Sequence, residues 1–521
     1  MIQLNKNHDP KTNDAIIKEL LQNKISLKEI LKETDLLFKG NCTKLPLISK
    51  KLFSFSEWLS FSFKRFLVKK ADYFDVESTQ LFIDSNDQVF PEWIGILDKE
   101  YKNLLKNIQR EVNVIEYGAK GDGITDDTEA FEKAIGKGSV IVRVPKGIYL
   151  VKGLKLPSYT SILGEGKGVT TIKLHDGAPV GQWLLTNKNH IRGNRNILVE
   201  NMTLDWNVER LRDIKKTSSG NNRSSCLTFA NVTYGWAKGV EAINPGLHCF
   251  DISSSIYTYF GDGTRSRRGS KYIWLDDLTG FGFGDDGITT HHSDYIFISN
   301  SHMCDPSGRS HQKGFSNSNG FEIDDGSRNV WLLNNSSTRC FGGIEVKAHH
   351  NASAAANVHI IGHLSVNDNR AYNFRHIGHH KGTEPESKTA YHISATNIVA
   401  IAPVVTDLYK GSEPRGMVIS GYKNVLINRF LLLGDPSYDF QTNPLIAIQY
   451  RARNVSLFNV TVKDFHNSGA SIKVFGGSQR ADDILIQNVV SYLSTPPVEI
   501  GSNVVNAAVD NIVQKTTPLF I

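Results

Sequence analysis

The stretch DYIFISNSHMCDPSGRSHQKGFSNSNGFEIDDGSRNVWLLNN, residues 294–335, decides the fold, because one short pattern both opens and closes it. The pattern begins with Asp or Asn, continues with apolar residues at alternating positions, and often ends in another Asn. Copies begin at Asn196, Asp294, Asn329, Asn357, Asn397, Asn424, Asn454 and Asp483. From Asp294 on, successive copies start 27 to 40 residues apart. A spacing of roughly 20–50 residues indicates stacked copies of one structural unit.

The repeat predicts an all-β fold, a right-handed parallel β-helix. Each unit holds only two or three short strands, which cannot bury an apolar face alone, so neighbouring units must stack around a continuous core. No helical pattern interrupts the repeats, and the recurring Asn residues are expected to form side-chain ladders at the turns. A β-sandwich is the alternative architecture, but the Asn-Gly turns that connect hairpin strands are scarce here.

The first part of the chain has a different spacing of apolar residues from the repeats. Ile16, Ile17, Leu20 and Leu21 recur at helical spacing, and residues 92–110 give a second helical candidate. From about residue 112 the chain consists of short β-rich runs separated by turn residues. We therefore predict a small, partly helical N-terminal domain over residues 1–110 and a β-helix domain over residues 111–521.

Composition and charge exclude several classes of protein. The 521 residues carry a formal net charge of +6, and residues 265–271 form the one dense basic run. No nucleic-acid-binding motif accompanies that run, so no nucleic-acid partner is predicted. The five cysteines are odd in number and include no C-x-x-C pair, which argues against a disulfide framework and a zinc site.

No segment of the sequence has the features of a membrane-spanning helix or of a signal peptide. The apolar run 52–68 is interrupted by charged residues and is shorter than the ~18 apolar residues that indicate a membrane span. The N-terminus lacks the basic start and apolar stretch of a signal peptide, so synthesis in a cytoplasm is expected.

Acidic side chains gather on three successive coils between residues 284 and 350. Ile288, Ile323 and Val346 hold equivalent apolar places, and the first two each lie six positions before a repeat start. Because side chains alternate along a strand, the neighbours of these residues face outward if all three face the core. The predicted outward set includes Asp285, His291, Glu322, Asp324, Glu345, Lys347 and His349.

The expected spacing of these carboxylates suits cleavage of a glycosidic bond. Residues two apart on a strand are ~6.6–6.8 Å apart and adjacent coils are ~4.8 Å apart. Retaining glycosidases hold two carboxyl groups about 5–5.5 Å apart and inverting ones about 6.5–9.5 Å, and either spacing fits this cluster. Crowded like charges also raise the pKa of at least one carboxyl, which could then act as a general acid.

The sequence thus yields a set of candidate site residues. Predicted catalytic residues are Glu322, Asp324, Glu345, Asp285 and Asp286, and predicted substrate-binding residues are Lys347, His291, His292, His349, Asp325 and Arg375.

Other interpretations remain open for some of these residues. Asp286-Gly287 and Asp325-Gly326 are also ordinary turn pairs, and Lys347 could simply neutralise Glu345. No metal-binding spacing such as H-E-x-x-H is present, so no cofactor is predicted, with a divalent cation as the lesser alternative.

Six stretches of this sequence resemble a known family. VIEYGAKGDGITDDTEAFEKAI (114–135), VPKGIYLV (144–151) and ILGEGKGVTTIKL (162–174) are similar to the opening of the pectate-lyase-like β-helix proteins, which are common in phage tailspikes. GDDGITTHHSDYIFISN (284–300), NGFEIDDGSRNVWLLNN (319–335) and GGIEVKAHH (342–350) resemble the pre-neck appendages of phages of Gram-positive hosts. The resemblance covers roughly residues 112–515.

This resemblance implies a virion protein, either a tailspike or an appendage. The expected function is a receptor-binding depolymerase that hydrolyses a host cell-surface glycopolymer, such as teichoic acid or capsular polysaccharide, at a glycosidic or a phosphodiester bond. Residues 1–110 are expected to attach to phage tail or neck proteins, and the assembly is expected to be a homotrimer.

A non-cleaving receptor-binding protein and a polysaccharide lyase are the alternative functions. A lyase usually needs Ca²⁺ and a basic residue, and only Lys347 and Arg375 lie near the acidic cluster.

Overall fold

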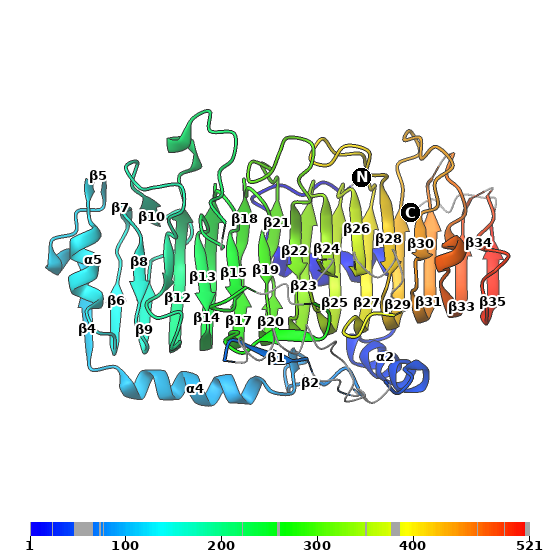
Figure 1. Cartoon of the computed structure of the whole chain (residues 1–521), viewed down its shortest axis with the longest axis horizontal. Coiled ribbons are helices and arrows are strands. Elements are labelled where there is room, and N and C mark those ends of the chain that lie inside the picture. The colour runs from blue at the N-terminus through cyan, green and yellow to red at the C-terminus, as the bar shows by residue number, and fades with distance from the viewer. Residues whose placement is uncertain are drawn as a thin grey trace.

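The computed structural model describes residues 2–22, 24–45, 66–71, 74, 76, 78–220, 222–257, 261–349, 352–376, 386–465, 467–493 and 495–515. The described residues form a right-handed parallel β-helix whose coils stack along the longest axis of the molecule (Figure 1). This confirms the predicted fold class.

Two parallel sheets make up the walls of the β-helix in the described part of the chain. One is a 12-stranded sheet of short strands: β8 (Leu154–Leu156), β11 (Leu185–Asn187), β13 (Leu227–Ala230), β15 (Phe250–Ser253), β19 (Ile288–Thr290), β22 (Asn319–Ile323), β24 (Gly342–Ala348), β26 (Arg370–His376), β28 (Arg415–Ser420), β30 (Ile446–Gln449), β32 (Ile472–Val474) and β34 (Val498–Ile500).

The other is a 19-stranded sheet that includes most of the long strands. Its members are β4 (Arg110–Asn113), β5 (Asp122–Asp126), β6 (Val140–Arg143), β7 (Gly147–Val151), β9 (Thr160–Leu163), β10 (Thr170–Leu174), β12 (Asn194–Asp205), β14 (Val232–Ile243), β17 (Lys271–Asp276), β18 (Thr279–Phe281), β20 (Asp294–Ser299), β21 (His302–Cys304), β23 (Arg328–Thr338), β25 (Ala356–Val366), β27 (Tyr391–Ile401), β29 (Lys423–Leu433), β31 (Arg453–Lys463), β33 (Asp482–Ser491) and β35 (Ala507–Gln514).

Asparagine ladders run along the bends of the long strands, as predicted. Asn334, Asn459 and Asn488 have φ of 56°, 56° and 59°, in the left-handed region that Asn tolerates better than most residues. The amides also bond from coil to coil: Asn488 Nδ2 donates to Asn459 Oδ1 at 3.2 Å, and Asn511 Nδ2 donates to Asn488 Oδ1 at 2.6 Å. The repeated Asn therefore stabilises both the bend within a coil and the stacking between coils.

The interior of the β-helix is one continuous apolar core. Ile288, Phe321 and Ile344, on adjacent short strands, are fully buried in it. Helix α5 (Thr128–Ile135) closes the N-terminal end, because Phe131 and Ile135 on its inner face pack into the same core.

The N-terminal helices lie lengthwise against the 19-stranded sheet (Figure 1). They are α1 (Asn13–Leu21), α2 (Leu27–Asn41) and α4 (Ile94–Asn107), and the 3-10 helix η1 (Pro10–Thr12) precedes α1. Ile17 packs with Leu364, and Leu104 packs in one cluster with Trp236. Each buried cluster of the described N-terminal residues thus includes β-helix side chains. Residues 46–65 of the predicted N-terminal domain lie outside the described residues.

Smaller elements complete the described chain. Strand β1 (Val68–Lys70) pairs with β16 (Thr264–Ser266), and β2 (Leu81–Ile83) pairs with β3 (Val89–Pro91), both antiparallel. The remaining 3-10 helices are η2 (Val114–Tyr117), η3 (Val208–Leu211) and η4 (Gly477–Gln479). Among the described residues, no helix has the length and apolar character needed to cross a membrane.

The predicted alignment of Ile323 with Val346 is confirmed, but that of Ile288 with Ile323 was wrong by two residues. Ile288 pairs with Phe321, and Ile323 pairs with Thr290 instead. The turn before β23 is one residue longer than the turn before β20, so Asp294 pairs with Arg328 and not with Asn329. Because side-chain direction repeats every two residues, the slip leaves the predicted inward and outward faces unchanged.

Candidate active site

The predicted acidic residues lie on the outer face of the 12-stranded sheet, where they form one row across adjacent coils. Thr289, Glu322, Glu345 and Asn373 are register partners on β19, β22, β24 and β26. Their strand neighbours Ile288, Phe321 and Ile344 point into the core, so these four side chains point outward. We call this row and the acidic and histidine side chains that contact it the carboxylate row.

Lys347 lies between two carboxylates of the row. Its Nζ is 2.6 Å from Glu322 Oε1 and 3.9 Å from Asp324 Oδ2, and all three side chains are buried. Burial alone would raise the pKa of Glu322, but the charge of Lys347 outweighs it and lowers the pKa to about 2. Burial and then the charge of Asp325 raise the pKa of Asp324 to about 7. Lys347 therefore neutralises Glu322, not Glu345 as the sequence suggested.

Glu345 has a separate cationic partner. Arg375 Nε donates to Glu345 Oε1, and Asn373 Nδ2 donates to the same oxygen at 3.0 Å. Glu345 is fully buried, while Arg375 keeps about a fifth of its side chain exposed. Burial would lower the pKa of Arg375, but the charge of Glu345 keeps it above its usual range. The arrangement is that of a buried ion pair, and it leaves Glu345 little access to a substrate.

Asp285 and Asp286 are adjacent in the chain but have opposite surroundings. His311 Nε2 is 2.7 Å from Asp285 Oδ1, and Asp285 retains some exposure. Burial would raise the pKa of Asp285, but hydrogen bonds from His248 and His311 hold it well below its usual range. Asp286 is buried, and burial followed by the charges of Asp285 and Glu322 raises its pKa well above its usual range.

The polar partners of Asp286 fix its orientation. Its Oδ1 accepts from Asn319 N at 2.9 Å and from Asn319 Nδ2 at 3.0 Å, and its Oδ2 is 3.6 Å from His248 Nε2. Asn319 Nδ2 also lies 3.2 Å from Glu322 Oε1, which connects Asp286 to the centre of the row. The pKa values of the two adjacent carboxyls are thus shifted in opposite directions, which is the separation that acid–base catalysis uses.

Histidines alternate with the acids along the row. His291 lies between two carboxylates, with Nδ1 3.5 Å from Asp251 Oδ1 and Nε2 3.7 Å from Asp324 Oδ2. Burial lowers the pKa of His291, but its bond to Asp251 and the charges of Asp251, Asp324 and Glu322 together outweigh burial and raise the pKa. His248 Nδ1 is 4.0 Å from the other oxygen of Asp251, so this buried acid lies between the two histidines.

Asp325 and His349 form the far end of the row. His349 Nδ1 is 2.9 Å from Asp325 Oδ2, and Tyr257 donates its hydroxyl to the same oxygen at 2.9 Å. Burial lowers the pKa of His349, but Asp324 and Asp325 outweigh it and raise the pKa to about 9. His292 lies behind the row, where it accepts from Ser266 N at 3.4 Å.

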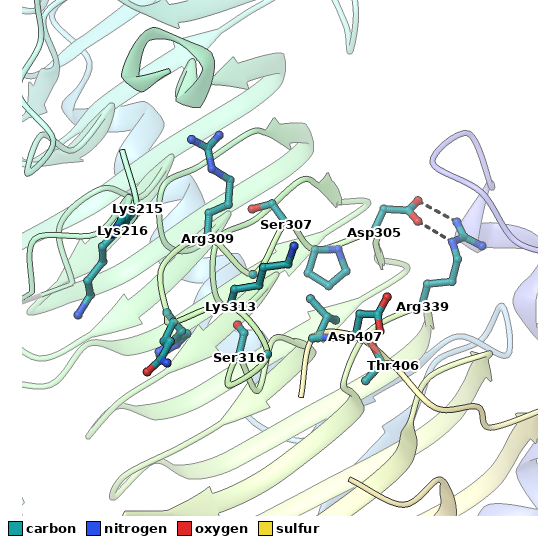
Figure 2. A pocket seen from close by; sticks show the side chains of 16 residues that line it. Lys215, Lys216, Asp305, Ser307, Arg309, Lys313, Ser316, Arg339, Thr406 and Asp407 are labelled. Carbon is teal, nitrogen blue, oxygen red and sulfur yellow. Dashed lines mark hydrogen bonds and ion pairs between the residues drawn. The ribbon is translucent and has the colours of Figure 1, made fainter. Parts of the chain in front are cut away.

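Two cavities flank the row. The larger, of about 1080 Å³, is lined by the loops around residues 215, 309 and 407 and by His311 (Figure 2). The smaller, of about 360 Å³, is lined by Trp183, His190, Arg223 and Tyr257, among others.

Three groups of side chains in the described chain bring metal-ligand atoms within 4.8 Å of one another: His248 with Asp285 and Asp286; His291 with Glu322 and Asp324; and Asp324 with Asp325 and His349. In the second group, Lys347 already supplies a positive charge 2.6 Å from Glu322. A lysine ammonium beside the ligands disfavours a divalent cation there, because like charges repel at this distance.

The structure brings together most of the predicted residues. Asp285, Asp286, Glu322, Asp324, Asp325, Glu345, Lys347, His291, His349 and Arg375 all belong to the row or contact it directly, while His292 lies behind it. Sequence reasoning missed His248, Asp251 and His311. Extending the strand alternation one coil earlier would have found Asp251, which pairs with Thr289. His311 lies on a loop, where no periodic signal points to it.

Comparison with known proteins agrees with this architecture. A family described as rhamnogalacturonase A/epimerase, pectate lyase-like, matches residues 111–345. The A-module of mannuronan C-5 epimerase AlgE4 from Azotobacter vinelandii has a TM-score of 0.55 at 17% identity and covers 77% of this chain and all of its own, so it shares the fold.

Closer relatives come from phages and from a bacterial genome. A putative phage-related protein of Bacillus subtilis is 49% identical over 84% of this chain and 54% of its own length. The pre-neck appendage protein of Bacillus phage phi29 is 44% identical over 77% of this chain and 46% of its own. The chain thus spans about half the length of these curated relatives.

The crystal structure of the N-terminal fragment of phi29 gene product 12 has a TM-score of 0.72 at 41% identity and covers 81% of this chain and 69% of that one. The chain belongs to the phage pre-neck appendage proteins with a pectate-lyase-like β-helix.

Proposed function

We propose that this protein is a depolymerase that hydrolyses a glycopolymer of the host cell surface, with Asp285 and Asp286 at the centre of the reaction. The single observation that carries the proposal is the contrast between these two carboxyls, whose oxygens lie within 4.8 Å of each other. Against the effect of burial, hydrogen bonds from His248 and His311 lower the pKa of Asp285, whereas burial and the charges of Asp285 and Glu322 raise the pKa of Asp286.

The proposed roles follow from these pKa shifts. Asp286 donates its proton to the oxygen of the leaving sugar as the glycosidic bond breaks, and Asp285, at a separation nearer to that of retaining glycosidases, attacks the sugar carbon to form a glycosyl ester. Water that is deprotonated by Asp286 then attacks the sugar carbon and displaces Asp285, so one water is consumed and both carboxyls return to their starting protonation states. Asn319, bonded to Asp286, orients the acid, and His311, bonded to Asp285, stabilises the ionised nucleophile.

The remaining acids of the row have a supporting role in this proposal. Glu322 and Asp324 are buried around Lys347, and Glu345 is bonded to Arg375. Among these acids, Glu322 carries a charge that helps to raise the pKa of Asp286, after burial and the charge of Asp285. The proposal thus centres the chemistry on Asp285 and Asp286, two of the five residues that the sequence predicted to be catalytic.

A lyase is less well supported. Elimination needs a base that can lose its proton and reach the sugar, and Lys347 and Arg375 were the nearest candidates. Both are held by carboxylates, and the pKa of each is raised rather than lowered, because those carboxylates outweigh the effect of burial. A cation kept charged in this way is a poor general base.

We further propose that the protein acts as part of the virion. The likeness to pre-neck appendages supports an association with the phage neck or tail. We assign this attachment to residues 1–110 and propose teichoic acid or capsular polysaccharide as the polymer. The assembly is proposed to be a homotrimer. Light scattering tests it: a mass three times that of the 58.0 kDa chain is expected, and a stable monomer at micromolar concentration would contradict it.

Substitution of the two acids tests the catalytic proposal. Asp286→Asn and Asp285→Asn should each lower the rate of polymer cleavage by about 10²–10⁴-fold, while polymer binding persists. Asp98→Asn, on exposed helix α4, serves as the matched control and should leave the rate unchanged. Polymer binding without cleavage by the unsubstituted protein would identify a receptor-binding protein instead.

A further inference from the structure

A strongly basic pocket adjoins the carboxylate row, and the reaction proposed above does not use it. It is the cavity of about 1080 Å³, and Lys215, Lys216, Arg309 and Lys313 line it. Figure 2 shows that these side chains come from two separate loops, with Thr406 and Asp407 on a third. The loops belong to different coils, so the pocket forms only when the β-helix is folded.

The charges within the pocket do not cancel. Asp305 is bound by Arg339, with Nε 2.5 Å from Oδ1 and Nη2 2.8 Å from Oδ2 (Figure 2). Lys215, Lys216 and Lys313 have no carboxylate within ion-pair distance among the residues that the structure describes, and Arg309 uses Nη2 to donate to the backbone oxygen of Arg212 at 2.7 Å. Asp407 is the remaining acid of the lining. The pocket therefore keeps a surplus of positive charge.

The pocket also meets the proposed reaction centre at one residue. His311 lines the pocket and at the same time contacts Asp285 Oδ1 at 2.7 Å. An anionic polymer that approached Asp285 would be repelled by an ionised carboxylate. Cations beside Asp285 would offset that repulsion and hold the charged part of the polymer next to the bond that is cleaved.

The dimensions suit a segment of polymer better than a single ion. Pockets for small molecules measure about 300–1,000 Å³, so a cavity at the upper end of this range accommodates several sugar or polyol units. Lysines reach such units as flexible point charges, which suits groups that repeat along a chain.

We propose that this basic pocket is a subsite for an anionic group of the polymer, a phosphodiester or a carboxylate. The inference rests on the proposed function, since it takes the same polymer as ligand, but it assigns residues that have no part in bond cleavage. Binding is therefore measured separately from cleavage, in the Asp286→Asn background, with soluble poly(glycerol phosphate), polygalacturonate and neutral dextran as probes.

Removing the charges should weaken binding selectively. In that background, Lys215→Gln with Lys216→Gln, and separately Lys313→Gln, should each reduce affinity for an anionic probe by about tenfold, as expected for loss of a hydrogen bond to a charged group. The salt dependence of binding should fall as well. The matched control is Lys102→Gln with Lys106→Gln on α4, which should change neither property. Unchanged thermal melting confirms that each variant is folded.

The arms of the experiment separate the two anion types. Loss confined to poly(glycerol phosphate) identifies a phosphodiester subsite, and loss confined to polygalacturonate identifies a carboxylate subsite. The inference is overturned if the parent binds neither anionic probe at low salt, if dextran binds as tightly as they do, or if the pocket variants bind like the parent. Cleavage that survives Asp286→Asn would instead overturn the proposed function and leave the subsite standing.

Discussion

His311 Nε2 lies 2.7 Å from Asp285 Oδ1, and this contact joins the basic pocket to the carboxylate row. The hydrogen bond raises the pKa of His311, and the same contact helps to lower the pKa of Asp285. The two groups stabilise each other's charged forms. This contact contributes to the opposite pKa shifts of Asp285 and Asp286, although both acids lie on one short turn.

The pH profile of cleavage should respond to His311. Asp285 must be ionised to attack the sugar carbon, so activity falls at acidic pH as Asp285 becomes protonated. His311→Gln removes a partner that lowers the pKa of Asp285, so the acidic limb of the profile should move to higher pH. His175→Gln is the control and should leave the limb in place. An acidic limb that does not move in His311→Gln would show that Asp285 is not the titrating nucleophile.

The buried pair of Glu345 and Arg375 should matter for stability. Arg375→Gln leaves a buried carboxylate without its cation and is expected to lower the free energy of unfolding by about 3 kcal/mol. Adding Glu345→Gln should restore part of the loss, because the unpaired charge is then gone. Urea denaturation measures both. Lys473→Gln breaks the exposed pair with Glu499 and should cost less than about 1 kcal/mol. Equal costs at the two sites would contradict a buried ion pair.

His349 should make stability depend on pH. Its pKa is raised to about 9 in the folded chain, against about 6.5 in an unfolded one. The stabilisation is therefore fully present below pH 6.5 and is lost as the pH rises through 9. The difference in melting temperature between the unsubstituted protein and His349→Gln should be largest near pH 6 and should shrink by pH 10. A difference that stays constant over this range would mean that His349 is not charged in the fold.

The asparagine ladder predicts an unusual order of substitutions. Asn488 has a φ of 59° and bonds with Asn459 and Asn511. Asn488→Ala loses these bonds and also strains the left-handed backbone, at a cost of about 1–2 kcal/mol, whereas Asn488→Gly loses only the bonds. Glycine should therefore be the milder substitution by about 1 kcal/mol in urea denaturation. Alanine as the milder substitution would show that the backbone conformation is not limiting.

The fold could be predicted because its determinants are periodic. The repeated Asn starts indicated stacked coils, and the alternation along β22 and β24 predicted that Glu322 and Glu345 face outward side by side. The exact register could not be predicted, because it depends on turn length, and the turn before β23 holds one extra residue. The register error of two residues did not change which side chains were predicted to face inward or outward, because side-chain direction along a strand repeats every two residues.

The partners of the acids were less accessible to sequence reasoning. Which cation neutralises Glu322 depends on how coils stack, and Lys347 was paired with Glu345 because the two residues are close in sequence, although Arg375 is the partner of Glu345. His311 reaches Asp285 from a loop, and loops follow no period. The contact of Leu104 with the cluster around Trp236 likewise joins segments far apart in the chain.

Release of polymer fragments tests the central claim most directly. Purified protein is incubated with defined teichoic acids and capsular polysaccharides, and the products are identified by mass spectrometry. We predict fragments that carry one added water per cleaved bond from at least one polymer, and no fragments from Asp286→Asn although it still binds that polymer. Fragments released at an undiminished rate by Asp286→Asn, unsaturated fragments without added water, or binding without any fragments would contradict hydrolysis at Asp285 and Asp286.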